Sequence, residues 1–192
     1  MKTIRLLAFA GSTREGSFNK KLIRAAAKLA ETGGHSVTVA DLRDYALPLY
    51  DGDLEEAKGV PANAVKLKQL IHEHDAVLIS SPEYNASVSA VLKNTVDWTS
   101  RSGGDNDPGK VWFEKPVALL SASPGGLGGI RALNHLRAIL QNLTAFIVPS
   151  QFALAKAHEA FADDGSLKDE AARKATEGVL NQLARTAQGL GS

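Results

Sequence analysis

Short apolar runs alternate with longer stretches of helical periodicity along the whole chain. The apolar runs have the length of strands and lie at residues 6–10, 35–40, 76–79, 117–120 and 144–155. Between the first two, Phe18, Leu22, Ala25, Ala26 and Leu29 recur on one helical face. Because strand and helix patterns alternate five times, the sequence predicts a doubly wound α/β fold, in which helices cover both faces of a parallel sheet.

Turn and cap residues place the boundaries of these elements. The first helix should end at Gly33-Gly34, a second should begin near Pro61, and a last one near Ser166 and Asp169. Pro149 should interrupt the fifth strand. Residues 41–59 are expected to form a long connection, and residues 101–114 an exposed polar loop.

The segment after the first strand has the composition of an anion-binding loop. Gly11, Ser12, Thr13, Arg14 and Ser17 stand between that strand and the first helix. Such a loop can direct several backbone N–H groups, hydroxyls and a guanidinium at one anion beside a helix N-terminus. A phosphate monoester is the expected ligand. The alternative is an ordinary strand-to-helix turn, in which Ser17 caps the helix and Arg14 is merely exposed.

Two common phosphate-loop patterns do not match this segment. Gly11 and Gly16 have the spacing of a Walker loop, but Ser17 and Phe18 stand where Lys and Ser or Thr are required. The dinucleotide fingerprint fails as well, because no second Gly follows Gly11 at position 13. The sequence therefore favours one terminal phosphate over a nucleoside triphosphate or a bridged pyrophosphate.

Two further polar loops follow the third and fourth strands. One, Ser80–Asn85, offers an aromatic ring and an amide, and the other, Ser121–Gly129, offers closely spaced backbone N–H groups. In a doubly wound sheet these loops meet the phosphate loop at the carboxyl edge, where strand order reverses. Together they match a flat heteroaromatic ring attached to a phosphate, which is the description of FMN.

Composition excludes several other classes of function. With 192 residues, of which 44% are apolar, the chain suits one domain over residues 1–192. The net charge of +1, without long basic clusters, argues against nucleic acid as a partner. The absence of cysteine excludes disulfides, thiolate metal sites and a cysteine nucleophile. His72 and His74 would point to different helical faces, so no metal site is expected.

The sequence also lacks two features of exported or membrane-inserted proteins. The N-terminal residues do not resemble a signal peptide, and no apolar stretch approaches the ~20 residues that span a bilayer. A cytoplasmic protein without a membrane span is therefore expected.

Several ordered motifs together resemble one family. They are Gly11-Ser12-Thr13-Arg14, Ser17-Phe18-Asn19, Pro82-Glu83-Tyr84-Asn85, Leu92-Lys93-Asn94, Asp97-Trp98, Ser100-Arg101, Ser123 and Gly128-Gly129. On these residues the chain resembles the NADPH-dependent FMN reductases of flavodoxin-like fold, and within them the bacterial quinone and chromate reductases. The resemblance implies a sheet order of 2-1-3-4-5, with FMN bound at its switch point.

The resemblance also implies roles for individual residues. The FMN phosphate and ribityl chain would be held by Ser12, Arg14, Ser17, Phe18 and Asn19. The isoalloxazine ring would be lined by Pro82, Glu83, Tyr84 and Asn85, and bordered by Ser123, Gly125 and Gly126. Asn85 and Arg101 would contact the substrate. The reacting centre would be FMN itself, so no catalytic side chain is assigned.

One position departs from the family pattern. Where the family usually has Pro-Gly after Ser87-Val88, this chain has Ser89-Ala90. Pro suits a first helical turn and Gly permits close approach, so the departure is expected to alter the local turn and access to the ring. We expect it to affect the range of substrates more than FMN binding.

The implied activity is transfer of reducing equivalents from NADPH or NADH through FMN to quinones, and to chromate or other small acceptors. Donor and acceptor would use the ring in turn, and the protein would be a homodimer or homotetramer. The alternative is a flavodoxin-type electron carrier, but such carriers are typically acidic and this chain is nearly neutral. For Arg101 the alternative is pairing with Asp97 and with a helix C-terminus.

Overall fold

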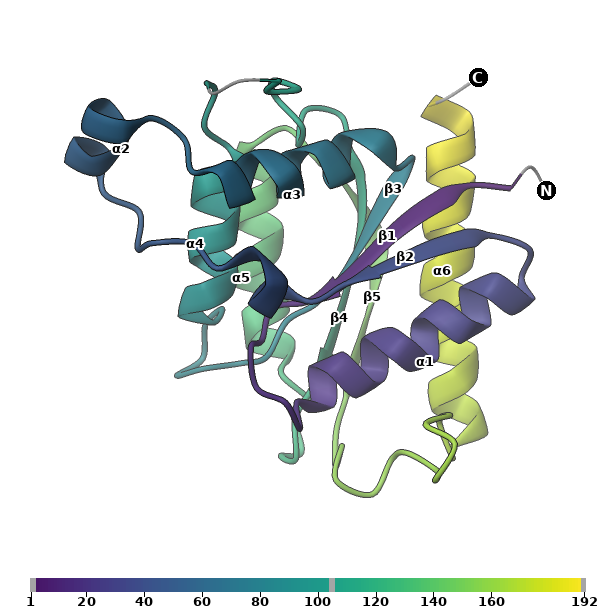
Figure 1. Ribbon diagram of the computed structural model, residues 1–192. Coiled ribbons are helices and arrows are strands. Elements are labelled where there is room, and N and C mark those ends of the chain that lie inside the picture. The colour runs from purple at the N-terminus through teal and green to yellow at the C-terminus, as the bar shows by residue number, and fades with distance from the viewer. Residues whose placement is uncertain (1–2, 104–105, 191–192) are drawn as a thin grey trace.

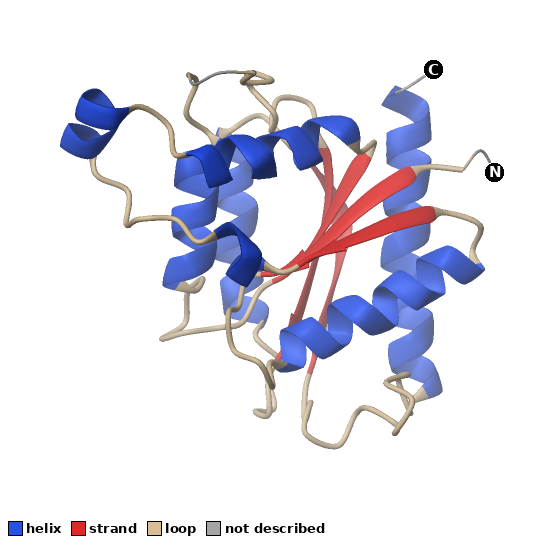
Figure 2. Ribbon diagram, viewed as in Figure 1, coloured by secondary structure: helices blue, strands red, loops and turns tan. Residues whose placement is uncertain are grey.

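The protein is built on one parallel sheet that runs through its centre (Figures 1 and 2). The computed structural model describes residues 3–103 and 106–190. Within them the strands are β1 (Arg5–Ala10), β2 (Ser36–Ala40), β3 (Ala76–Ser80), β4 (Pro116–Ala122) and β5 (Phe146–Leu154). Their order is β2-β1-β3-β4-β5 and every neighbouring pair is parallel. The predicted fold class and strand order are confirmed.

Helices cover both faces of the sheet, as the alternating pattern predicted (Figure 1). Helices α1 (Phe18–Thr32) and α6 (Glu170–Leu190) lie on one face. Helices α3 (Ala62–Glu73), α4 (Ala90–Thr99) and α5 (Ile130–Asn142) lie on the other. Each layer has its own hydrophobic core, because a strand sends successive side chains to opposite faces.

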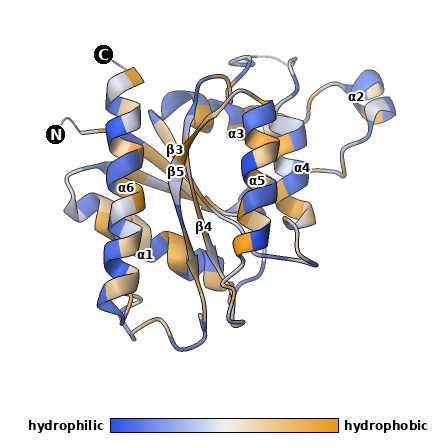
Figure 3. Cartoon of the chain, turned by 180° about the vertical axis from the view of Figure 1, so that it is seen from behind, coloured by the Kyte–Doolittle hydropathy of each residue, from blue (hydrophilic) through white to orange (hydrophobic). Residues whose placement is uncertain are grey.

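The two inner strands carry the densest part of both cores. All side chains of β3 and β4 are buried, which explains why these strands are apolar throughout rather than alternating. The helices contribute one face only, and Figure 3 shows hydrophobic and hydrophilic residues interleaved along α1, α5 and α6. Lys20 departs from this rule: it lies outside the apolar stripe of α1, yet it is 6% exposed and pairs with Asp41.

The connection at residues 41–59 contains more structure than the sequence predicted. A short 3-10 helix spans Leu42–Tyr45, and α2 (Gly52–Lys58) stands away from the sheet (Figure 1). Asp41 and Asp51 cap these helices by accepting hydrogen bonds from N–H groups two residues later. These helices are stabilised by local capping. They are too short to show an apolar periodicity, so the sequence pattern did not predict them.

Helix α4 holds the middle of this connection against the body of the protein. The Asn94 amide donates to the carbonyl of Pro48 at 2.8 Å and accepts from the N–H of Tyr50 at 2.8 Å. Trp98 Nε1 also donates to Pro48, and the rings of Trp98 and Tyr50 meet edge to face. The long connection is therefore anchored to α4 at one point.

The prediction of an exposed loop at residues 101–114 is wrong for its second half. Val111 and Trp112 are almost fully buried, and Trp112 Nε1 donates to the Thr99 hydroxyl at 3.0 Å. Asp107 forms an ion pair with Lys68, which is 0% exposed. The many glycines and polar residues concealed this packing, because they resemble a solvated loop in the sequence. Residues 104–105 lie outside the described part.

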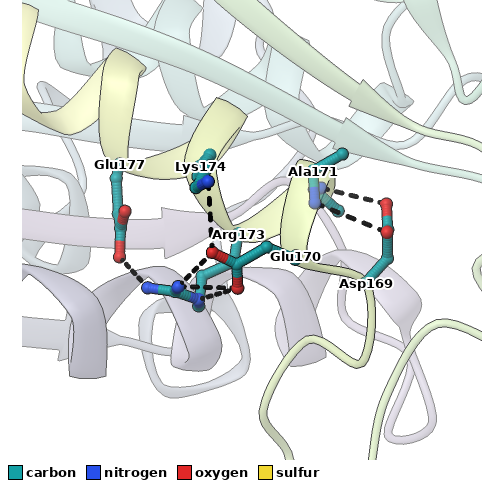
Figure 4. A network of polar contacts seen from close by, with 7 residues as sticks. Asp169, Glu170, Ala171, Arg173, Lys174 and Glu177 are labelled. Carbon is teal, nitrogen blue, oxygen red and sulfur yellow. Dashed lines mark hydrogen bonds and ion pairs between the residues drawn. The ribbon is translucent and has the colours of Figure 1, made fainter.

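The last helix begins where the sequence predicted, whereas β5 runs without interruption through Pro149, contrary to the expected break. Asp169 accepts hydrogen bonds from the N–H groups of Ala171 and Ala172 and so starts α6 (Figure 4). Arg173 joins Glu170 and Glu177 on the same helix. In β5 the register with β4 shifts between Val117 and Leu119, next to Pro149, because proline cannot donate to the ladder.

Candidate functional site

Three loops meet at the carboxyl edge of the sheet, as the topology requires. They are the phosphate loop (residues 11–17), the ring loop (residues 82–87) and the glycine loop (residues 123–129). The N–H of Gly11 donates to Ser80 at 2.9 Å, and the N–H of Ser81 donates to Leu120 at 2.8 Å. These bonds continue the sheet by one residue and bring the three loops side by side.

The phosphate loop presents donors that nothing in the described chain uses. The N–H groups of Thr13, Glu15, Gly16 and Ser17 have no acceptor within residues 3–103 and 106–190. Ser17 occupies the N-cap position of α1, yet its hydroxyl caps no N–H of that helix. The N-terminus of α1 therefore keeps its partial positive charge and its free N–H groups.

Side chains around the loop add to this anion-binding character. Arg14 is exposed and forms no ion pair within the described residues, while its N–H donates to the Ser12 hydroxyl at 3.3 Å. Ser12 and Ser17 are both 4% exposed, so their hydroxyls lie inside the loop. Unused donors, a free guanidinium and an uncapped helix fit a phosphate group.

Asn19, also expected to hold the cofactor, is built into the scaffold. Its amide nitrogen donates to the carbonyl of Ala122 at 2.9 Å. Its oxygen accepts from the Ser80 hydroxyl at 2.8 Å and from the N–H of Ala122 at 2.9 Å. Because that oxygen already has two donors, Asn19 fastens α1 to the ends of β3 and β4. Phe18, its half-buried neighbour, packs against the core shared by α1 and α6.

The ring loop is a tight turn with an unusual backbone. Tyr84 and Ser87 exchange two backbone hydrogen bonds, of 2.9 and 3.0 Å. The two residues between them, Asn85 and Ala86, have φ of 51° and 64°. Asn adopts this left-handed conformation readily, whereas Ala does so at a cost. Tyr84 and Asn85 are exposed, Pro82 is buried, and the turn therefore presents a ring and an amide at the edge of the sheet.

Glu83 turns away from solvent and binds the start of α5. Its carboxylate accepts from the N–H of Arg131 at 3.1 Å and forms an ion pair with the same residue's guanidinium. Burial alone would raise the pKa of Glu83, but the hydrogen bonds and charge of Arg131 outweigh it and hold the pKa below its usual value. Beside this pair, His135 Nδ1 bonds the Ser87 hydroxyl at 2.9 Å. Two side-chain contacts therefore fix the ring loop to α5.

The glycine loop exposes backbone where a ring can approach. Ser123 accepts from the N–H of Gly125 at 3.2 Å, while the N–H groups of Gly126 and Leu127 donate to nothing in the described chain. Gly128 has φ of 63°, and a Cβ there would lie 2.7 Å from the backbone of Ala153. Only glycine permits that approach to β5, which brings the loop back to the sheet edge.

Arg101 is the one predicted site residue that lies elsewhere. It follows the C-terminal end of α4, and the ten residues of that helix put about 15 Å between it and the ring loop. The pairing with Asp97, which was the expected alternative, is not formed: Lys93 binds Asp97, and Arg101 Nε donates to Glu55 of α2 at 2.8 Å. Its guanidinium lies 5.6 Å from the centre of the Tyr50 ring. Glu55 lies 46 positions before Arg101 in the sequence. Helical spacing relates residues three or four positions apart, so it could not predict this pair.

Sequence reasoning missed the residues that connect the loops. Glu83 was expected at the ring, but its partner Arg131 and the partner of Ser87, His135, were not identified, because both belong to a helix that looked purely structural. Ser89 was noted only as a departure from a pattern, yet its hydroxyl donates to the Gly11 carbonyl at 2.6 Å. In the sequence, these contacts are indicated only by position: Ser89 lies just after the ring loop, and Arg131 and His135 lie just after the glycine loop.

Two negative findings delimit the site. Among the described residues, no helix is long and apolar enough to cross a membrane. No group of three or more His, Asp or Glu side chains in residues 3–103 and 106–190 could hold a metal ion.

Comparison with known proteins finds related sequences over most of the chain. The model of a family described as NADPH-dependent FMN reductase matches residues 4–159. An NADPH:quinone oxidoreductase of Arabidopsis thaliana is 38% identical over 183 residues, which are 94% of this chain and 90% of that protein. An NAD(P)H-dependent FMN reductase of Pseudomonas aeruginosa is 35% identical over 181 residues, covering 94% of this chain and 93% of that one.

A solved structure agrees over nearly the whole length. FerB, a flavoenzyme NAD(P)H:(acceptor) oxidoreductase from Paracoccus denitrificans, superposes with a TM-score of 0.81 at 32% sequence identity. The match covers 97% of this chain and 98% of that one. The three loops of the carboxyl edge therefore belong to a fold shared with a flavoenzyme along its full length.

Proposed function

The chain belongs to the NADPH-dependent FMN reductase family, and from this premise we propose that it oxidises NAD(P)H and reduces quinones at an FMN held by the three loops. The observation that carries the placement is the uncapped N-terminus of α1, with its free N–H groups and the unpaired Arg14. Bound FMN would supply the redox chemistry, accepting a hydride from the nicotinamide and passing two electrons to the acceptor.

The phosphate loop would anchor the cofactor by its phosphate. Arg14 supplies a full positive charge, and the N–H groups of residues 15–17 supply donors that are already in place. Ser12 and Ser17 can donate their hydroxyls from inside the loop. Asn19 would act indirectly, because its bonds to β3 and β4 hold the first turn of α1 where the phosphate must sit.

The ring loop and the glycine loop would position the ring and leave one face open. Pro82, Tyr84 and Asn85 would line it on one side, and Ser123, Gly125 and Gly126 on the other. The free N–H groups of Gly126 and Leu127 would stabilise negative charge that develops on a reduced ring, since fixed donors need no reorganisation. Exposed Tyr84 and Asn85 stand where a nicotinamide or a quinone would contact the protein.

We propose that donor and acceptor would use one open face of the ring in turn, which is a ping-pong mechanism. Steady-state rates measured at several fixed quinone concentrations should give parallel double-reciprocal lines against NADPH. Intersecting lines would contradict the shared face. Turnover with NAD(P)H and a quinone alone also separates this proposal from an electron carrier, which would need a reductase to be supplied.

Arg101 enters the proposal only through a second copy of the chain. Its distance from the ring loop prevents it from reaching the site of its own subunit, so its expected role with the phosphates of NADPH or an oxyanion such as chromate requires a homodimer or homotetramer. In such an assembly Arg101, with 46% of its side chain exposed, would face a neighbouring site.

The test compares Arg101→Ala with Arg185→Ala, which removes an exposed cation from the far face on α6. With FMN content unchanged, Arg101→Ala should raise the KM for NADPH or for chromate several-fold and leave reduction of a neutral quinone intact. Equal kinetics for both variants, or a monomeric protein in sedimentation experiments, would reject the role.

A further inference from the structure

The Ser89 hydroxyl joins the two halves of the proposed cofactor site. It donates to the carbonyl of Gly11, the first residue of the phosphate loop, at 2.6 Å, and accepts from the N–H of Leu92 at 3.2 Å. Ser89 is therefore the N-cap of α4, the helix that follows the ring loop. The residue is 1% exposed, so both bonds are shielded from water.

Gly11 is held by contacts from two sides as well as by this bond. Its N–H donates to Ser80 at the end of β3, and a Cβ at this position would lie 2.8 Å from Cδ2 of Leu92. The start of the phosphate loop is therefore pressed directly against the first turn of α4. Because Gly11 cannot move without α4, the conformation of residues 12–17 depends on that helix.

Removing the hydroxyl would leave two buried groups without partners. The Gly11 carbonyl would have no donor, and the N–H of Leu92 would lose its cap. The carbonyl can regain a partner only if it turns toward water, which would rotate the peptide that leads into Ser12. That rotation would misdirect the N–H groups of the phosphate loop.

We propose that Ser89 is a positioning residue for the FMN phosphate, acting through the Gly11 carbonyl. The inference rests on the proposed location of FMN at these loops. Ser89 is also the position at which the sequence departs from the family pattern. The sequence alone suggested that this departure affects access to the ring, whereas the structure gives Ser89 a role in cofactor binding.

The test exploits riboflavin, which has the ring of FMN but no phosphate. Dissociation constants for FMN and riboflavin are measured by flavin fluorescence for the wild type and for Ser89→Ala. We expect Ser89→Ala to bind FMN about tenfold more weakly, the scale of one buried hydrogen bond, and riboflavin within twofold of the wild type.

Three further variants separate positioning from a general loss of stability. Ser89→Thr keeps the hydroxyl and should restore FMN affinity. Ser89→Pro keeps the backbone, because φ at this residue is −69° and its N–H donates to no described residue, but it removes the hydroxyl and should behave like Ser89→Ala. Thr176→Val removes a comparable buried hydroxyl from α6 and should leave both flavin affinities unchanged.

The outcomes distinguish this inference from the proposed function. If the wild type prefers FMN strongly and Ser89→Ala weakens both flavins equally, Ser89 does not act on the phosphate and the inference fails. If the wild type binds FMN no better than riboflavin, the phosphate loop does not hold the phosphate, and the proposed placement of FMN fails first.

Discussion

At the scale of single residues, Arg14 of the phosphate loop and Asn19 of α1 differ in whether their polar groups already have partners. Arg14 is exposed and unpaired within the described chain, whereas the amide of Asn19 is hydrogen-bonded to residues of β3 and β4. Removing Arg14 should therefore affect ligand binding more than folding. We expect Arg14→Ala to weaken FMN binding about 10- to 100-fold, the scale of a charge-assisted contact, with an unchanged midpoint of thermal unfolding without flavin.

Flavin fluorescence titration checks this expectation, with riboflavin as the ligand that lacks the phosphate. Arg185→Ala is the matched control, since it removes an exposed arginine from α6. Loss of riboflavin affinity in Arg14→Ala equal to the loss of FMN affinity would show that the residue does not recognise the phosphate.

At the scale of elements, a buried ion pair ties α3 to the segment after α4. The ammonium of Lys68, which is 0% exposed, binds the carboxylate of Asp107 and the carbonyl of Arg101. Breaking such a pair leaves an uncompensated buried charge. We expect Asp107→Ala to lower the free energy of unfolding by about 3 kcal/mol in denaturant titrations, and added Lys68→Met to recover most of that loss.

An exposed pair on α4 provides the control. Lys93 and Asp97 are 46% and 32% exposed, so Asp97→Ala should cost under about 1 kcal/mol. A cost for Asp107→Ala as small as that for Asp97→Ala would mean that water reaches the Lys68 ammonium, and that the pair does not hold the segment.

At the scale of the whole molecule, partly buried carboxylates make stability depend on acid. Burial alone would raise the pKa of Asp41, Asp75, Glu83 and Asp107, but hydrogen bonds and nearby cations outweigh it, so each folded pKa lies below its usual value. These groups bind fewer protons when folded than when unfolded. Their contribution is therefore complete above the unfolded pKa of about 4 and is lost as pH falls through the lower folded values.

Urea unfolding at pH 7, 5.5 and 3 measures this dependence. We expect nearly equal stability at the two higher values and a clear decrease at pH 3. Glu83→Gln should be less stable than the wild type at pH 7, and the difference should shrink at pH 3, because the stabilisation by the Glu83 charge is progressively lost below the usual pKa of a glutamate. A constant difference at all three values would contradict the assigned role of its charge.

The architecture, and the sheet edge where the candidate site lies, could be predicted from the amino-acid pattern alone. Strand and helix have different periods, so the alternation of apolar runs with helical stripes was enough to predict the parallel sheet, and parallel strands bring their following loops to one edge. The phosphate loop could also be recognised in the sequence, because Gly11, Arg14 and Ser17 lie within seven consecutive positions. Local patterns carry this information, since each depends on neighbours along the chain.

Which polar side chains are free and which already have partners depends on contacts between distant segments of the folded chain. Asn19 and Glu83 looked like ligand-binding residues, yet their partners, Ala122 and Arg131, lie 103 and 48 positions away. For Arg101 the expected alternative to substrate binding was a pair with Asp97, but its guanidinium binds Glu55. Hydrogen bonds and ion pairs depend on distances of a few ångströms between segments, and periodicity does not encode them. The hydrogen bond from Ser89 to Gly11 is another contact of this kind. The two residues are 78 positions apart, and the bond forms only when α4 packs against the phosphate loop.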